Sequence, residues 1–198
     1  MTATITLSPG LEVLEMNSID PTFYDKTHSG KVNVRKVDGQ YFTMKLQWPK
    51  LKRSEFRSIW AFILGQRGRF DGFIVIPPQA ATPDGVATGT PIISGAGQTG
   101  TSLATSGWTI STAGIMKAGD LIVIAGDSKA YMLYTDADSD GSGDATLTLC
   151  SPLRASPADG AAITVSNIPL TVRLLNDTAT YTQNGALYTL QIECEEAL

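Results

Sequence analysis

Hydrophobic and polar residues alternate most regularly in two segments that lie near opposite ends of the chain. In residues 40–48 every second residue is apolar, and the same holds for residues 186–195. A period of two places alternate side chains on opposite faces of a β-strand. The pattern therefore predicts two long strands, each with one buried face, which is formed by Phe42, Met44, Leu46 and Trp48 in the first and by Tyr188, Leu190, Ile192 and Cys194 in the second.

Helical spacing of apolar residues occurs in one segment, about residues 54–65. Ser54 is suited to cap its first turn, Glu55 favours the positive end of the helix, and Gly65 is placed to end it. The spacing predicts an amphipathic helix that packs on a sheet through Phe56, Ile59, Trp60, Ile63 and Leu64. The apolar run 73–76 follows as a central strand, which Pro77 and Pro78 end.

Shorter strands complete the expected organisation. Residues 4–7, 11–16 and 31–37 precede the first long strand, with a turn-rich stretch at 17–30, and residues 170–175 precede the second. After Pro78 the composition shifts to Ala, Gly, Thr, Ser and Pro up to about residue 118, as at an insertion boundary. Short strands at 121–125, 130–135, 145–150 and 162–165 then suggest a small barrel. We expect a mainly β fold: a discontinuous domain of residues 1–78 and 167–198, with a barrel of residues 79–166 inserted.

Composition narrows the function classes. The chain has 198 residues, of which 42% are hydrophobic and 17% charged, as in a folded β protein rich in turns. A net charge of −4 gives no reason to expect nucleic-acid binding, and the basic cluster at 45–57 is either a solvated surface or a face toward a neighbouring subunit. No run approaches the roughly 20 apolar residues of a membrane span, and no secretory signal opens the chain. We expect synthesis in the cytoplasm and, at Cys150 and Cys194, buried free thiols.

Two motifs resemble ligand-binding loops. Residues 95–100 match the G-x-G-x-x-G pattern of dinucleotide sites, with Asp120 about 20 residues later, but the following residues form helices poorly and no βαβ unit surrounds them. Residues 136–144 begin like a calcium-binding EF-hand loop, yet Leu147 stands where the bidentate Glu is needed. We expect no cofactor; a solvated turn or a weak Ca²⁺ site stay open for the second loop, with the candidate ligands Asp136, Asp138, Asp140 and Asp144.

Catalytic groups are scarce. His28, the one histidine, lies beside Ser29 and near Asp25 in a turn, where sequence neighbours seldom form a relay. The carboxylates of Glu193, Glu195 and Glu196 are more simply the wet edge of a terminal strand. We expect no enzyme.

Several stretches resemble phage tail proteins of the distal tail family. They are residues 53–74, the loop segments 89–92 and 95–100, and the short motifs at 117–122 and 151–154. The resemblance implies a β-sandwich with a helix that forms a hexameric ring at the distal end of the tail tube, and an inserted barrel like an oligonucleotide-binding fold. It implies as partners the tube protein and the hub or tip protein, with DNA passing through the lumen unbound, in a virion tail assembled in the host cytoplasm.

The resemblance directs attention to two residue sets. We expect the ring core and interface to include Trp48, Phe56, Trp60, Ile63, Leu190 and Ile192. Another tail part, either a tube or a terminator protein, is an alternative. A second alternative is a carbohydrate-binding module that contacts a host-surface glycan through Trp108, Tyr131 and Tyr134, since sugars stack on exposed aromatic rings.

Overall fold

The computed structural model describes residues 3–198 and confirms a mainly β protein with one α-helix. Contacts within the chain group it into two compact units. The first contains residues up to Phe73 together with Val172–Ala197, and the second contains Ile74–Thr171 together with Leu198. The expected ring-forming domain with a barrel inserted at 78/79 and 166/167 stays a prediction.

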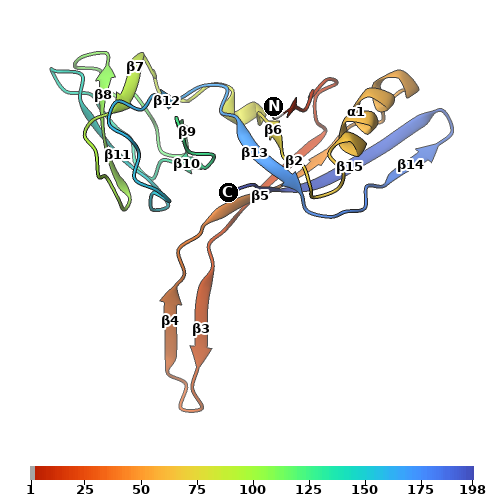
Figure 1. Cartoon of the computed structure of the whole chain (residues 1–198), viewed down its shortest axis with the longest axis horizontal. Helices are drawn as coiled ribbons and strands as arrows, with labels where there is room; N and C mark the ends of the chain where they lie inside the picture. The colour runs from red at the N-terminus through yellow and green to blue at the C-terminus, as the bar shows by residue number, and fades with distance from the viewer. Residues whose placement is uncertain (1–2) are drawn as a thin grey trace. The chain divides into compact units, whose positions relative to one another are not determined.

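The first unit is built on a sheet whose strands come from both ends of the chain (Figure 1). The order is β1-β6-β13-β15-β5-β2, and β14 pairs with β15 beside β13. The strand bounds are Ala3–Thr4 (β1), Val13–Ile19 (β2), Tyr41–Gln47 (β5), Phe73–Val75 (β6), Leu170–Leu174 (β13), Tyr181–Asn184 (β14) and Leu187–Glu196 (β15). Strands β6 and β13 lie where the chain leaves for the second unit and where it returns.

Alternation decides which face of this sheet is buried. Along β5 the residues alternate between half-exposed and buried, and β15 repeats the pattern in register, with Ile192 opposite Leu46 and Cys194 opposite Met44. The two long strands expected from the sequence are confirmed; the expected residues are buried except Tyr188, which is half-buried.

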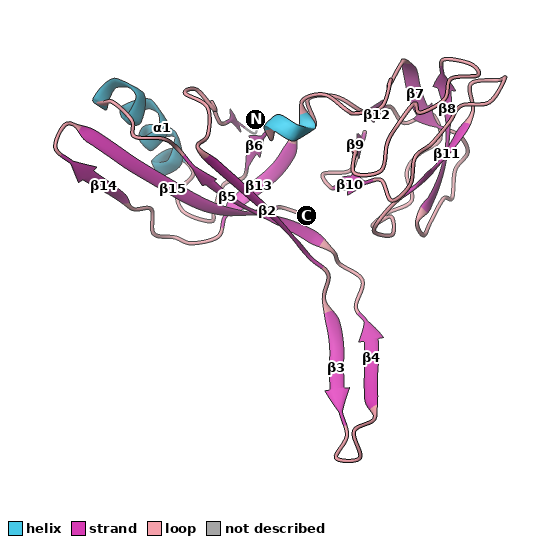
Figure 2. Cartoon of the chain, turned by 180° about the vertical axis from the view of Figure 1, so that it is seen from behind, coloured by secondary structure: helices cyan, strands magenta, loops and turns pink. Residues whose placement is uncertain are grey.

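Helix α1 (Arg53–Gly65) lies against the β14–β15 hairpin on the buried face (Figure 2). The ring of Phe56 stacks on Tyr188 with centroids 4.4 Å apart, and Trp60 meets Tyr181 edge-on at 5.0 Å. Two details differ from the sequence prediction. The cap is Lys52, whose backbone N–H donates to Glu55 Oε2 at 2.8 Å, so Ser54 lies within the first turn; and Leu64 is exposed, since it points away from the sheet.

A second hairpin consists of β3 (Thr22–Lys26), which lies in the stretch expected to be turns, and β4 (Val32–Lys36), which lies within the strand expected at 31–37. These strands pair only with each other, and all ten of their residues are exposed. The N–H of Val37 donates to the carbonyl of Pro21 at 3.1 Å, which joins the hairpin to the β2–β5 ladder as one long ribbon. The sequence signal is weak here because neither strand has a buried face.

The second unit contains two three-stranded sheets, ordered β10-β9-β12 and β11-β8-β7. Its elements are a 3₁₀ turn at Pro78–Ala80 and strands Gly89–Ile93 (β7), Ser102–Trp108 (β8), Leu121–Ile124 (β9), Ala130–Met132 (β10), Ala145–Thr148 (β11) and Ile163–Thr164 (β12). Four of these were expected; β7 and β8 were not, because Gly, Thr and Ser dominate them. The two sheets enclose a core that includes Leu103, Trp108, Ile122, Tyr131 and Leu147.

The expectation of a small closed barrel is corrected. The two sheets are joined by isolated bridges, Ile92 to Ala162 on one side and Leu133 to Leu149 on the other, and no continuous ladder closes them. At Gly107, with φ of +83°, a Cβ would lie 2.5 Å from the carbonyl oxygen of Thr90, so the close approach of β8 to β7 requires glycine.

The effect of a substitution on the free energy of unfolding should depend on which face of the first unit's sheet carries it. Leu46 is fully buried between β15 and β2, so Leu46→Ala should lower the free energy of unfolding by about 3 kcal/mol through lost burial and a residual cavity. Thr43→Ala, on the half-exposed face of the same strand, should change it by less than about 0.5 kcal/mol. Denaturant unfolding monitored by circular dichroism checks both, and equal effects would contradict the assignment of faces.

Candidate functional site

The residues expected at the ring core lie inside the first unit. Trp48, Leu190 and Ile192 are buried under the sheet, and Phe56 and Ile63 are the buried side of α1. They hold the unit together, so a partner cannot reach them. Among the six expected residues only Trp60 is half-exposed, at the edge of the aromatic cluster with Tyr181.

The opposite face of the sheet is polar and crosses three strands. The registers align Glu15 of β2 with Lys45 of β5 and Glu193 of β15, and one row further they align Thr43 with Glu195. A cavity of about 290 Å³ opens among Glu15, Lys45 and Glu193. Because acidic side chains outnumber basic ones across β2, β5 and β15, this surface carries a net negative charge.

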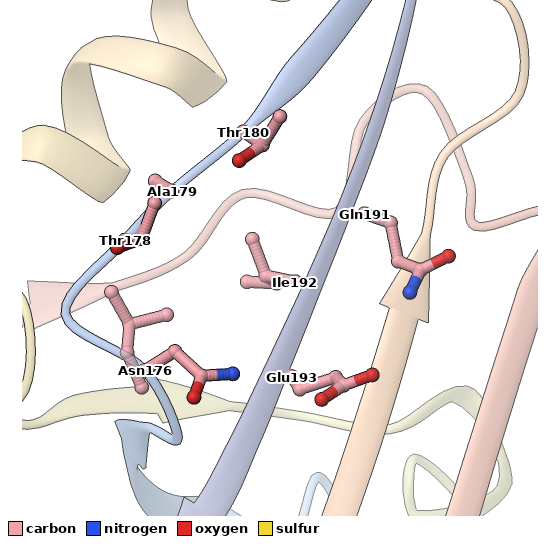
Figure 3. A pocket seen from close by; sticks show the side chains of 8 residues that line it. Asn176, Thr178, Ala179, Thr180, Gln191, Ile192 and Glu193 are labelled. Atoms are coloured by element: carbon pink, nitrogen blue, oxygen red, sulfur yellow. The ribbon is translucent and has the colours of Figure 1, made fainter.

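A strap of residues 175–180 interrupts the pairing along β15. Leu174 pairs with Cys194 and Tyr181 pairs with Leu190, so six residues of the strap face only three of β15. A cavity of about 200 Å³ lies between them, bordered by Asn176, Thr178 and Thr180 on the strap and by Gln191, Ile192 and Glu193 on the strand (Figure 3). The carboxylate of Asp177 accepts the N–H of Arg69 at 3.2 Å, which ties the strap to the loop after α1.

The β3–β4 hairpin is an exposed arm of which the sequence prediction contained β4 but missed β3. Phe23, Tyr24 and Val34 are 66%, 62% and 61% exposed, although such side chains favour burial. Apolar residues flank the Thr27–Gly30 turn on both sides, with Phe23 and Tyr24 before it and Val32 and Val34 after it. Two such segments around a short turn are the signal that could have predicted the hairpin. An arm of this kind is typical of a surface that another chain covers.

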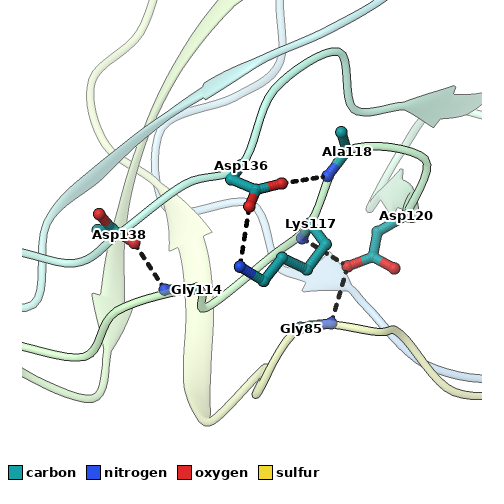
Figure 4. Close-up of polar contacts among 7 residues, drawn as sticks. All are labelled: Gly85, Gly114, Lys117, Ala118, Asp120, Asp136 and Asp138. Carbon is teal, nitrogen blue, oxygen red and sulfur yellow. Dashed lines mark hydrogen bonds and ion pairs between the residues drawn. The ribbon is translucent and has the colours of Figure 1, made fainter.

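In the second unit, the aspartates of residues 136–144 bind backbone and side-chain donors at separate places (Figure 4). Asp136 accepts from Lys117 Nζ at 2.8 Å and from the N–H of Ala118 at 2.9 Å, and Asp138 accepts from the N–H of Gly114 at 2.6 Å. Asp140 accepts the N–H groups of Ser142 and Asp144 within its own turn. Through these hydrogen bonds the carboxylates fix the conformation of the loops.

The candidate ligands do not gather into a metal site. Across residues 3–198, no three or more His, Cys, Asp or Glu side chains form a group that could hold a metal ion. The hydrogen bond from Lys117 holds the pKa of Asp136 below its usual value, and the backbone N–H groups of Asp144 and Ser142 do the same for the pKa of Asp140. Asp144 contributes its backbone to this turn.

The glycine-rich loop 95–100 is organised around a side chain. Gln98 donates through Nε2 to the carbonyls of Ser94, Gly95 and Ala104, and its Oε1 accepts the N–H of Ala104. It connects β7 to β8 and precedes no helix, so it lacks the helix N-terminus that receives a pyrophosphate. Asp120 binds loops instead: its carboxylate accepts the N–H groups of Asp84, Gly85 and Lys117 at 2.8, 3.1 and 2.7 Å.

The expected sugar contacts are corrected at two of three positions. Trp108 and Tyr131 lie in the core of the second unit, where their ring faces are packed against protein. Trp108 donates to Thr105 Oγ1, and Tyr131 donates to Asp127 Oδ2; burial raises the pKa of Tyr131. Only Tyr134, which is 69% exposed, offers a ring to solvent. One exposed aromatic ring offers little surface on which a sugar could stack.

The two cysteines are free thiols in different surroundings. Cys194 is buried in the sheet, and this burial raises its pKa to about 12. Cys150 is exposed, so the expectation that it is buried was wrong; it follows β11, where the strand ends.

No helix in residues 3–198 has both the length and the apolar character that crossing a membrane requires.

These features define a structural protein of β-sheets with an exposed arm, and comparison with known families places it further. Residues 2–80 match the family described as distal tail protein pb9, A domain, N-terminal. The match supports a phage distal tail protein, as the resemblance in the sequence indicated, and therefore a structural component of a phage tail and of the virion. The matched segment contains β1 to β6, α1 and the exposed hairpin. No curated protein matches the chain.

The role of Asp120 can be tested by truncation. Asp120→Ala leaves three backbone N–H groups without their acceptor and should destabilise the second unit by about 3 kcal/mol. Asp144→Ala, which removes a carboxylate with no hydrogen bond in residues 3–198, should leave its stability within about 0.5 kcal/mol. Differential scanning calorimetry of the two variants separates them, and similar losses would argue against a structural role for Asp120.

Ionisation of Asp136 should make the stability of the folded chain depend on pH. Its folded pKa lies below the ordinary value of 3.8, so the ionised form is stabilised in the native state; this contribution is present above that value and is lost as pH falls through the folded pKa. Asp136→Asn should therefore lower the melting temperature at pH 7, and the difference from the unmodified chain should shrink toward zero at about pH 2. Calorimetry at both pH values measures this, and a difference independent of pH would contradict it.

Proposed function

We propose that this chain is a non-enzymatic subunit of a hexameric ring at the distal end of a phage tail tube, where it joins the tube protein to the tail tip or hub protein. The family that residues 2–80 match is described as a distal tail protein, and the extension of that description to this complete role is our proposal.

The observation that carries the proposal is the exposed β3–β4 hairpin, which lies within the matched segment. Its apolar side chains gather on a ribbon with two open edges and no cover from other strands. Such a ribbon favours pairing or packing with another chain, because unpaired edges and exposed apolar side chains are costly in a monomer. A neighbouring copy in a ring supplies that cover in a repeating, head-to-tail manner.

The polar sheet face suits the lumen of the ring. Helix α1 covers the other face, so the row Glu15, Lys45 and Glu193 is the side left for solvent. A net negative lining repels the phosphate backbone and lets DNA pass without binding.

The proposal is tested by the mass and outline of the purified chain. Native mass spectrometry should give six copies, and negative-stain electron microscopy should give rings with a central opening. Long tubes would move the assignment to a tube protein, and a monomer at all concentrations, also with the tube and tip proteins present, would refute the ring.

Shortening the arm separates assembly from folding. Replacing residues 20–40 by Asn-Gly joins Ile19 to Tyr41, which already face each other in the β2–β5 ladder, so the sheet should remain folded. We expect ring formation to weaken at least about tenfold, because the apolar arm surface is lost. A control that replaces only the tip residues 27–30 by Asn-Gly keeps β3 and β4 and should assemble normally. Rings of unchanged stability without the arm would contradict its role.

A further inference from the structure

Five large apolar side chains among the described residues of the first unit are more than half exposed, and they form two separate groups. Phe23, Tyr24 and Val34, which are 66%, 62% and 61% exposed, lie on the β3–β4 arm. Leu64 and Phe70, which are 55% and 70% exposed, lie at the end of α1 and in the loop that follows it. Two uncovered apolar groups on one subunit can cover each other when copies associate.

The second group borders a pocket between the end of α1 and the strap, here called the helix-end pocket. Its volume is about 430 Å³, and its lining includes the buried residues Ile63 and Leu174 together with Leu64, Arg67 and Asp177. The guanidinium of Arg67 lies 4.4 Å from the centroid of the Phe70 ring, so Phe70 stands at the rim. Since an apolar cavity of roughly 150 Å³ is large enough for a benzene molecule, the pocket has room for an aromatic side chain.

The uncompensated charge at the helix-end pocket is negative. Arg67 and Asp71 neutralise each other through an ion pair of 2.7 Å between Nη2 and Oδ2. The carboxylate of Asp177 forms no ion pair within residues 3–198 and accepts the backbone N–H of Arg69. A surface that brings a cation beside an apolar group therefore complements the pocket.

One face of the arm combines apolar and positively charged side chains. Residues that lie directly opposite each other in an antiparallel pair point to the same face, and the register places Tyr24 opposite Val34. Phe23, one position away, points to the other face. Lys26 lies on the Tyr24 face and forms no ion pair within the described residues. The complete Tyr24 face consists of Thr22, Tyr24, Lys26, Val32, Val34 and Lys36.

A rotation can bring the arm of one copy to the pocket of another. Within one copy the two surfaces leave each other uncovered, because every residue of β3 and β4 is exposed, and so are Leu64 and Phe70. A rotation about an axis perpendicular to the line from arm to pocket places the arm of one copy and the pocket of the next at the same height. The contact joins two different surfaces, so its repetition closes a ring when the rotation angle divides a full turn.

We propose that the Tyr24 face of one copy packs on the helix-end pocket of the next copy, with the ring of Tyr24 in the pocket and Lys26 beside Asp177. The inference rests on the proposed ring and names the surface that receives the arm. This contact covers all five exposed apolar side chains except Phe23. Aromatic anchors in pockets carry much of the binding energy of interfaces, and charge pairs select the register.

A photoreactive residue at position 24 identifies the surface that the arm contacts. Tyr24 is replaced by benzoylphenylalanine in the full chain, unlabelled and ¹⁵N-labelled preparations are mixed and assembled, and cross-linked peptides are identified by mass spectrometry. We expect mixed-label cross-links from position 24 to residues 63–70 or 174–179. The same probe in place of Phe23, the neighbouring aromatic residue on the opposite face, should give no cross-link to these segments.

Other outcomes overturn the inference in recognisable ways. Cross-links from position 24 only to residues 20–38 of the other copy indicate a contact between two arms. Rings without cross-links to residues 63–70 or 174–179, or with equal cross-links from positions 23 and 24, leave the proposed function in place but refute the pocket contact. A chain that stays monomeric, also with the tube and tip proteins present, refutes both.

Charge reversal tests the contact independently. Lys26→Glu places a carboxylate beside Asp177 and should weaken assembly at least about tenfold. Adding Asp177→Lys to this variant restores opposite charges and should return assembly to within about threefold of the unmodified chain. Lys31→Glu, the same charge change just before β4, should leave assembly within about twofold. No recovery in the double variant, with circular dichroism showing that it is folded, would refute the contact.

Discussion

The first unit depends on one strand, β15, which pairs on both sides over its whole length except at the strap. On one side it binds β5, and on the other it binds β13 and then β14, while Tyr188 supports the ring of Phe56 on α1. This strand comes last in the sequence. The N-terminal strands therefore cannot complete their sheet until the end of the chain returns to its centre, which makes the contacts of this unit strongly non-local.

The central position of β15 explains how the remaining elements are arranged. A long insertion between β6 and β13 is tolerated because its two ends are held side by side in the sheet, and the entropy of closing a loop grows only slowly with its length. The inserted unit stabilises its own turns locally: Asp120 and Gln98 each bind several backbone groups, and Asp136 binds the N–H of Ala118 and the side chain of Lys117. The residues that resembled ligand sites in the sequence therefore have another role. Where the strands are short, their side chains make hydrogen bonds to backbone groups in place of a regular strand ladder.

The same sheet leaves two kinds of surface for assembly. Its polar face carries alternating charges that hold water, whereas its edges and the β3–β4 ribbon carry unpaired backbone and apolar side chains. In the ring proposed above, the β3–β4 ribbon serves as an interface between copies.

The sequence by itself determined the mainly β class, the two long strands, the helix and its buried residues Phe56, Ile59 and Ile63, since periods of two and 3.6 are local consequences of burial on one face. It did not determine β3, β7 and β8, whose residues lack that periodicity because they have no single buried face or are rich in Gly, Thr and Ser. Tertiary structure alone decided that Trp108 and Tyr131 are core residues, that Tyr134 is exposed, and that the aspartates of residues 136–144 bind backbone at separate places. Whether an aromatic ring or a carboxylate faces solvent depends on which strands and loops pack over it, and that is set by pairings between residues far apart in the chain.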